Sequence, residues 1–311
     1  MTAVHAIVNP HAAGGETGRI WPEVRQAMAH SLGPVSAALT RHPGHATTLA
    51  REALMEGATL IVAVGGDGTV SEVVNGFFTM QGPINPQAVL AVVNAGTGGD
   101  FARTFGIEGD WRAAVARLAA ATPRKIDLAR VSYTDHAGMP ETRYFDNIAS
   151  FGMSGAITRR VNAARLGKRL LGRHIYAWHG LMALLAHRNR RIRLRIDDGF
   201  NETLAVSTVA IANGRYFGGG MMVAPQADPC DGLLDVIILH DMTRRDLCAD
   251  PRAIYAGRHL DHAKVQVLRG ARIEAVALDG PAPVMLEVDG ETPGRLDAVF
   301  EVVPQALSIR I

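Results

Sequence analysis

Short apolar runs alternate with helix-like segments over the first 120 residues. The runs at residues 60–64 and 89–93 are apolar at every position, and those at 4–8 and 35–40 are mostly apolar. A strand that is apolar throughout is buried on both faces, as in a parallel sheet covered by helices on both sides. We therefore predict an α/β domain with a parallel sheet and right-handed crossovers over residues 1–125.

Helical periodicity places helices between these strands. The predicted helices cover residues 21–32, 46–56, 70–77 and 111–120. Gly57 directly follows the second of them, where a glycine can adopt the left-handed conformation that ends a helix.

After Pro123 most segments predict strands. Residues 191–196 alternate three aliphatic side chains with three arginines, which is the period of a strand with one buried face. Further strands are predicted at residues 203–212, 233–239, 272–278 and 284–288, and a helical segment at 154–187. A chain of 311 residues suits two domains better than one. We expect a β-rich second domain over residues 126–300.

Two glycine-rich loops follow the fully apolar runs. Gly65-Gly66-Asp67-Gly68-Thr69 follows the run at 60–64 and opens a helix, and residues 94–100 follow the run at 89–93. Glycines allow a ligand to approach the backbone closely, and a helix N-terminus offers free N–H groups to an anion. Because open α/β sheets bind ligands at the carboxyl ends of their strands, the two loops predict a phosphate-binding site.

The loops do not match two common phosphate-binding motifs. None of the three lysines, Lys125, Lys168 and Lys264, lies in a glycine loop, so there is no P-loop, and the GxGxxG fingerprint is absent. Each loop instead carries an aspartate, Asp67 or Asp100. A carboxylate beside a polyphosphate is favourable when a divalent cation lies between them, and oxygen ligands suit Mg²⁺. We assign both aspartates to a Mg²⁺–nucleotide network; the alternative is that both only form turns.

With these loops the chain resembles the diacylglycerol kinase catalytic-domain family, which includes bacterial lipid kinases, sphingosine kinases and ceramide kinases. The matching motifs run in order along nearly the whole chain. They are Ile7-Val8-Asn9-Pro10, Thr40 with Pro43-Gly44-His45-Ala46, Gly65 to Thr69, Gly96-Thr97-Gly98 with Asp100-Phe101-Ala102-Arg103, Asn147 to Gly155, Asn213 to Ala224, Asp231 to Asp235, and Asp289-Gly290-Glu291. Their order and spacing make the resemblance highly specific.

The resemblance implies an α/β nucleotide domain followed by a β-sandwich domain, with ATP in the cleft between them and residues 301–311 returning to the first domain. It implies ATP and Mg²⁺ as cofactors, and ATP contacts at Asn9, Thr40, residues 66–72 and Thr97. With the two glycine loops included, the candidate nucleotide-binding residues are Asn9, Thr40, Gly65, Gly66, Asp67, Gly68, Thr69, Val70, Ser71, Glu72, Gly96, Thr97 and Asp100.

The resemblance also implies roles for two acidic turns. Asp228, Asp231 and the carbonyl oxygen of Leu233 match the family's structural Mg²⁺ site, and a tight turn of this kind can converge several oxygens on one ion. The alternative is an ordinary Asp-Gly turn that enters a strand. The resemblance places Glu291 at the cleft as the general base, supported by Asp289, where the bare sequence would predict an exposed hairpin turn.

A kinase reaction would need the acids of these loops and turns to lie close together. Phosphoryl transfer requires positioning, charge neutralisation and a base near the acceptor hydroxyl, so Glu291, Asp289 and Asp67 are the candidate catalytic residues. One departure from the family pattern lies in the second loop, where Gly99 precedes Asp100 in place of the usual asparagine. The lost amide and the more flexible turn predict a reduced or altered activity.

Basic residues are concentrated in one part of the chain. Between Asn147 and Ile196 there are eleven lysines and arginines and no Asp or Glu. Such a block attracts an anionic partner, although it can also be a solvated face. Its mixture of basic, leucine and aromatic residues over 154–186 can lie on an anionic membrane, or pack as an amphipathic helix on the β-rich domain. Nucleic acid is not expected, because clustered aromatics for base stacking are absent.

The chain offers no membrane span or secretion signal in its sequence. The N-terminus lacks a basic region and a long apolar run, and the longest apolar stretch, residues 176–186, is too short to cross a bilayer. Cys230 and Cys248 form neither a disulfide framework nor a metal motif, so we expect reduced thiols. We predict a cytoplasmic protein with peripheral contact at the inner membrane surface, and leave a homodimer open.

Three functions follow in order of preference. The first is an ATP- and Mg²⁺-dependent kinase for a lipid hydroxyl, on diacylglycerol, phosphatidylglycerol or a sphingoid base. The second is a kinase for a soluble hydroxyl compound such as NAD, which the motifs at 213–224 and 231–235 disfavour. The third is a nucleotide-sensing, membrane-binding protein of weak catalytic power, suggested by the altered second loop.

Overall fold

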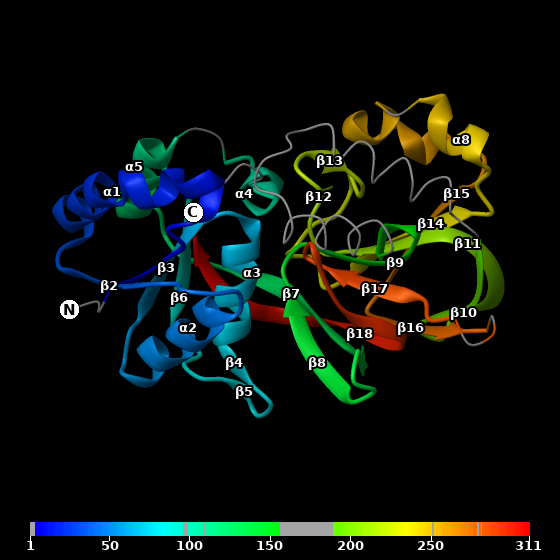
Figure 1. Ribbon diagram of the computed structural model, residues 1–311, viewed down its shortest axis with the longest axis horizontal. Coiled ribbons are helices and arrows are strands. Elements are labelled where there is room, and N and C mark those ends of the chain that lie inside the picture. Colours follow the sequence, from blue (N-terminus) through cyan, green and yellow to red (C-terminus); the bar gives the residue numbers. More distant parts are fainter. Residues whose placement is uncertain are drawn as a thin grey trace.

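The computed structural model describes residues 4–95, 99–107, 110–155, 189–250, 252–278, 280 and 282–311. It has two halves side by side, an α/β half that carries the N-terminus and a β-rich half (Figure 1). The predicted helical segment at 154–187 lies, apart from its first two residues, outside the described part of the chain.

Four parallel strands form the sheet of the α/β half, in the order β2–β1–β3–β6. They are β1 (Val4–Val8), β2 (Val35–Leu39), β3 (Leu60–Gly65) and β6 (Val89–Asn94). Every residue of β3 is buried, which confirms the prediction from its apolar run. Parallel pairing of neighbours brings the carboxyl ends of β3 and β6 side by side, with Gly65 opposite Asn94.

Helices cover both faces of this sheet (Figure 1). They are α1 (Glu16–Leu32), α2 (His45–Met55), α3 (Asp67–Gly76) and α5 (Trp111–Ala120). Met28 of α1 packs in one buried cluster with Val62 of β3, and Val73 of α3 packs in another with Ile61. Successive residues of β3 therefore point to opposite layers, as a strand buried on both faces requires.

Helix boundaries differ from the predictions mainly at the N-termini. Helix α1 begins at Glu16, five residues before the predicted start, because Gly15 has a φ of 102° and ends the preceding turn. Helix α3 begins at Asp67 rather than residue 70. The short helix α4 (Asp100–Thr104) was not predicted, since five residues are too few to show a helical period.

Antiparallel strands build the β-rich half. They are β7 (Arg124–Asp135), β8 (Pro140–Phe145), β9 (Ile148–Gly152), β10 (Arg190–Ile196), β11 (Phe200–Ala212), β14 (Leu234–His240), β15 (Val265–Gly270), β16 (Arg272–Ala277), β17 (Met285–Val288) and β18 (Glu291–Arg310). Strand β9 pairs with β11 and β17, and β17 pairs with β18, so the sheet turns back over its own core. Phe145, Phe151 and Phe300 lie fully buried in that core.

Strand β18 joins the two halves into one sheet. It pairs with β7, β16 and β17, and its last residues pair in parallel with β6, with Ser308 opposite Val89. The buried Asp127 fixes a break in this pairing: its carboxylate accepts hydrogen bonds from the N–H of Gln305 at 2.7 Å and of Gly232 at 2.8 Å. The predicted domain boundary near residue 125 falls at the start of β7.

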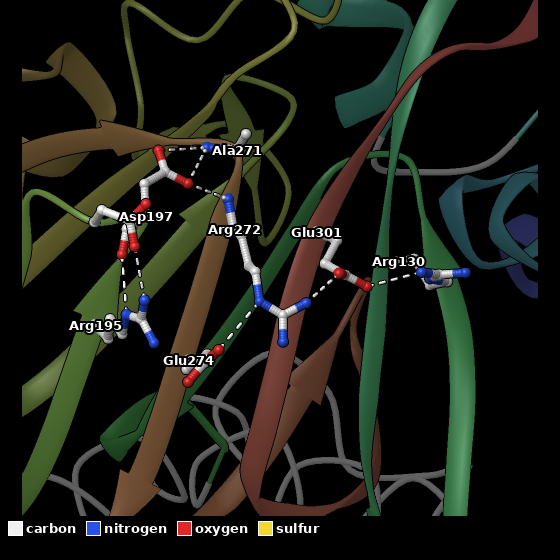
Figure 2. A network of polar contacts seen from close by, with 8 residues as sticks. Arg130, Arg195, Asp197, Ala271, Arg272, Glu274 and Glu301 are labelled. Atoms are coloured by element: carbon white, nitrogen blue, oxygen red, sulfur yellow. Dashed lines mark hydrogen bonds and ion pairs between the residues drawn. The ribbon is translucent and has the colours of Figure 1, made fainter.

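The outer face of the β-rich half carries a row of alternating charges (Figure 2). Arg272 of β16 contacts Glu274 of the same strand and Glu301 of β18, and Glu301 also contacts Arg130 of β7 at 2.8 Å. The hydrogen bond from Arg130, followed by the charges of both arginines, lowers the pKa of Glu301. In the neighbouring β10, Ile192, Leu194 and Ile196 are buried while the three arginines that alternate with them are exposed, as predicted.

Within the described ranges, no helix has both the length and the apolar composition needed to pass through a bilayer.

Candidate active site

The first glycine loop is built by close backbone packing at the end of β3. A Cβ atom on Gly65 would lie 2.5 Å from Thr69 Oγ1, so only glycine fits there. The same hydroxyl accepts a 3.1 Å hydrogen bond from Asn9 Nδ2 at the end of β1. The N–H groups of Thr69 and Val70 donate to the carbonyl of Gly66, which starts α3 directly after the loop. The amides at this helix start therefore lie at the edge of the sheet where a phosphate would bind.

Asp67 connects the two glycine loops. Its Oδ2 accepts a 2.8 Å hydrogen bond from the N–H of Gly99, and its Oδ1 accepts a 3.2 Å bond from the N–H of Phe101. Each carboxylate oxygen can accept more than one hydrogen bond, so both retain acceptor capacity for a water or a cation. Gly96 and Thr97, from the same second loop, lie outside the described residues.

Asp100 faces the β-rich half. Its side chain is 5% exposed, forms an ion pair with Arg103, and accepts a 2.6 Å hydrogen bond from the N–H of Gly219. Burial is the main cause that raises its pKa. The guanidinium of Arg103 in turn lies 5.5 Å from the ring centre of Tyr216. Asp100 thus holds a loop of one half against a loop of the other.

Glu72 and Thr40 each hold backbone groups around the start of α2 and the end of β2. The carboxylate of Glu72 accepts hydrogen bonds from the N–H of Gly44 at 2.8 Å and of Ala46 at 3.0 Å, so it caps the start of α2. Thr40 is buried, and its N–H donates to the carbonyl of Val8. Glu72 therefore holds the start of α2, which follows Thr40 in the chain. Val70 and Ser71, also candidates, are buried in the first turns of α3.

The Asp289-Gly290-Glu291 turn lies between β17 and β18. The carboxylate of Asp289 accepts hydrogen bonds from three successive N–H groups, those of Asp146, Asn147 and Ile148. Asp289 has a φ of 46°, a left-handed backbone that favours a turn. Glu291 begins β18 and is exposed, so its carboxylate is open to solvent and to a substrate. The structure thus gives Asp289 a positioning role and leaves Glu291 accessible.

Asp146 lies beside this turn and was not among the predicted site residues. It is buried, and its pKa is raised well above the usual range by burial first, then by Asp289, which shares a hydrogen bond with it, and by the charge of Asp67. Asp146 thus links the turn at Asp289 electrostatically to the loop at Asp67. An acid directly before the Asn147–Gly155 motif was the available signal.

The turn from Asp228 to Leu233 is held by its own side chains. Asp228 Oδ1 accepts from the N–H of Cys230 at 3.1 Å, and Asp231 Oδ1 accepts from the N–H of Leu233 at 3.0 Å. The other oxygen of Asp231 forms an ion pair with Arg269. The oxygen donors suit Mg²⁺, but the guanidinium already neutralises one carboxylate of the set.

The structure combines a helix-covered parallel sheet, which has glycine loops at its strand ends, with an antiparallel half that is joined to it through β18. Two known protein-family domains match these two halves of the chain. Residues 3–131 match the diacylglycerol kinase catalytic domain, and residues 147–311 match the YegS C-terminal NAD kinase beta sandwich-like domain. The chain therefore belongs to the diacylglycerol kinase family of lipid kinases, and it is a kinase.

Similar proteins and solved structures match most or nearly all of the length of this chain. A Stenotrophomonas maltophilia protein named "Probable lipid kinase YegS-like" is 31% identical over 302 residues, covering 96% of this chain and 92% of the relative. A diacylglycerol kinase of Mycobacterium tuberculosis is 30% identical over 259 residues, covering 83% and 78%. The structure of a Bacillus anthracis diacylglycerol kinase has a TM-score of 0.71 at 19% identity, covering 99% and 96%.

More distant structures share the fold. An NAD kinase from Archaeoglobus fulgidus, solved in complex with ATP, has a TM-score of 0.52 at 15% identity and covers 99% of this chain and 93% of its own. The predicted α/β domain followed by a β-sandwich domain is thereby confirmed.

Proposed function

We propose that the protein transfers the γ-phosphate of ATP, with Mg²⁺, to a hydroxyl group of a lipid: diacylglycerol, phosphatidylglycerol or a sphingoid base. The observation that supports this most is the pair of hydrogen bonds from the second glycine loop to Asp67. They hold an acid at the N-terminus of α3, where backbone N–H groups and a carboxylate together suit a metal-bound phosphate.

The residues have separate roles in this proposal. The loop amides and Mg²⁺ would bind the triphosphate, with Asp67 among the groups that hold the cation directly or through water. Glu291 is the general base for the acceptor hydroxyl, because its carboxylate is exposed at the start of β18. Asp289 orients that turn through three backbone hydrogen bonds. Asp100 acts through the contact that it makes with Gly219.

A second cation is proposed at the turn of Asp228, Asp231 and the Leu233 carbonyl. The oxygens that do not face Arg269 would hold Mg²⁺ there, and we propose that this ion contributes to stability. The acceptor lipid would reach the site from a membrane surface. These two points are proposals that rest on the family resemblance and on oxygen chemistry.

The test is to incubate purified protein with γ-labelled ATP, Mg²⁺ and a panel of lipids in mixed micelles, with NAD as a separate acceptor. Label in one of the three lipid classes and none in NAD supports the proposal. Label in NAD alone contradicts it and favours the soluble-acceptor kinase. Absence of label in every acceptor, with ATP bound in an equilibrium assay, favours a nucleotide-binding protein of weak catalytic power.

A further inference from the structure

Strand β17 carries an acid where an apolar residue would be expected. Glu287 lies between Leu286 and Val288, and its side chain is fully buried. The pairing of β17 with β9 places Glu287 opposite Ser150. A buried carboxyl group needs hydrogen-bond partners, so its contacts indicate what it does.

Both oxygens of Glu287 are engaged. Oε1 accepts a 2.5 Å hydrogen bond from the N–H of Gly290, and a 2.5 Å hydrogen bond joins Oε2 to Ser150 Oγ. Gly290 is the middle residue of the turn that presents Glu291. The turn is therefore held by two carboxyl groups. That of Asp289 accepts a hydrogen bond from the N–H of Ile148 at the start of β9, and that of Glu287 accepts one from the N–H of Gly290 within the turn.

We propose that Glu287 is a positioning residue of the kinase, which fixes the Gly290 N–H and thereby sets the direction in which Glu291 points toward the acceptor hydroxyl. The proposal rests on the assignment of Glu291 as the base. Glu287 itself contacts no reacting atom, because it lies buried beneath the turn.

The charge state of Glu287 follows from its surroundings. Burial is the main cause that raises its pKa, to about 8, and the charge of Asp289 raises it further. The hydrogen bonds from Ser150 and Gly290 and the charge of Arg143 of β8 act in the opposite direction. At pH 7 the group is therefore a neutral acid, which can bond to Gly290 through one oxygen and to Ser150 through the other.

Ionisation then disturbs the turn. Above pH 8 a second negative charge would appear two residues from Asp289, in a buried setting where like charges repel strongly. The turn would shift, and Glu291 with it. Glu287→Gln imitates the neutral acid in shape and hydrogen bonding, and it cannot ionise.

The experiment is the pH profile of kcat between pH 6 and 9.5 for wild type, Glu287→Gln and Glu287→Ala, with the exposed Glu202→Gln as the matched control. We expect kcat of wild type and of the control to fall about tenfold per pH unit above pH 8, while Glu287→Gln keeps its activity to pH 9. Glu287→Ala should lower kcat at least about tenfold at pH 7 and leave KM for ATP within about twofold, because the nucleotide loops are untouched.

The proposal is overturned if wild type and Glu287→Gln fall together above pH 8, or if Glu287→Ala retains wild-type kcat. Urea denaturation of wild type and Glu287→Gln at pH 7 and pH 9 gives a readout that needs no catalysis: wild type should lose stability relative to the variant. If no acceptor is phosphorylated at any pH, the proposed function fails. The denaturation result then separately tells whether the buried acid has the ionisation that the inference requires.

Discussion

The carboxylate of Asp100 in α4 accepts a 2.6 Å hydrogen bond from the backbone N–H of Gly219, so a nucleotide-side loop is bonded directly to a loop of the β-rich half. Thr104 of the same helix bonds to the N–H of Arg215 at 3.1 Å. Two hydrogen bonds from one short helix thus connect the halves beside the candidate site.

Removing the Asp100 carboxylate should loosen that connection. We expect Asp100→Ala to lower the free energy of unfolding by about 1–3 kcal/mol, because a buried carboxylate that accepts from Gly219 and pairs with Arg103 is removed. Asp100→Asn should cost less, since an amide oxygen can still accept from Gly219. Urea denaturation measures both, with the exposed Asp198→Ala as a control that should stay within about 0.5 kcal/mol of wild type. Equal losses in Asp100→Ala and the control would argue against the contact.

Glu291→Gln should leave folding intact and lower kcat by about 10²-fold or more, the usual scale for a general base. The residue is exposed and, within the described residues, makes no side-chain hydrogen bond or ion pair, so the substitution removes a proton acceptor and little else. Steady-state kinetics with the lipid identified in the panel would check this, alongside the far-UV spectrum. Normal turnover would remove Glu291 from the mechanism.

Asp67→Asn separates the two roles of Asp67. Its amide oxygen can still accept one N–H of the second glycine loop, while the charge that would hold Mg²⁺ is lost. We expect kcat to fall by about 10²–10³-fold, the scale of losing one preorganised electrostatic contact, with a much smaller change in thermal stability. Asp67→Ala should impair both. Unchanged ATP consumption in either variant would contradict the assignment of the loop.

Stability should depend on pH through Glu287. Its pKa is raised from 4.5 to about 8 in the folded chain, so folding favours the protonated form. The stabilisation is complete below pH 4.5 and is lost as pH rises through 8. The free energy of unfolding of wild type, minus that of Glu287→Gln, should therefore fall by up to about 1.4 kcal/mol per pH unit across this window. Urea titrations at several pH values measure the difference; a flat line would contradict it.

Mg²⁺ should stabilise the fold if it binds the turn of Asp228 and Asp231. Free ion at ten times its Kd adds about 1.4 kcal/mol to the free energy of unfolding. We expect this gain in wild type and its loss in Asp228→Asn, measured by thermal denaturation without nucleotide. An equal gain in both proteins would place the ion elsewhere. No gain in wild type would indicate that the guanidinium of Arg269, and not Mg²⁺, neutralises the carboxylates of this turn.

Much of the α/β half could be predicted because its strands are wholly or mostly apolar and glycine-rich loops follow two of them. Helix 111–120 was predicted to the residue, and β3 and β6 differ by one residue at an end. The return of residues 301–311 to the first domain was predicted from the family resemblance alone, and the strand that β18 pairs with there was not predicted. The last residues of β18 pair with β6, more than two hundred positions earlier, and no local pattern carries a contact of that separation.

The residues of the candidate site likewise include some that the sequence predicted and some that it did not. The loop at Asp67 was predicted because glycines and the helix start adjoin it in the sequence. Asp146 and Glu287 were missed, because an isolated acid in a strand pattern is usually a surface residue. What makes them buried is pairing across long separations: Asp146 bonds to Asp289, and Glu287 to Ser150, each pair about 140 residues apart.

The path of β18 also has a consequence for synthesis of the chain. The strand inserts between β6 and β7 only at residues 307–310, so the sheet of the α/β half has an open edge until those residues have left the ribosome. Until that pairing forms, β6 is an edge strand with unpaired backbone groups, which can pair with another chain, so completion of the nucleotide-side sheet depends on the last strand of the β-rich half.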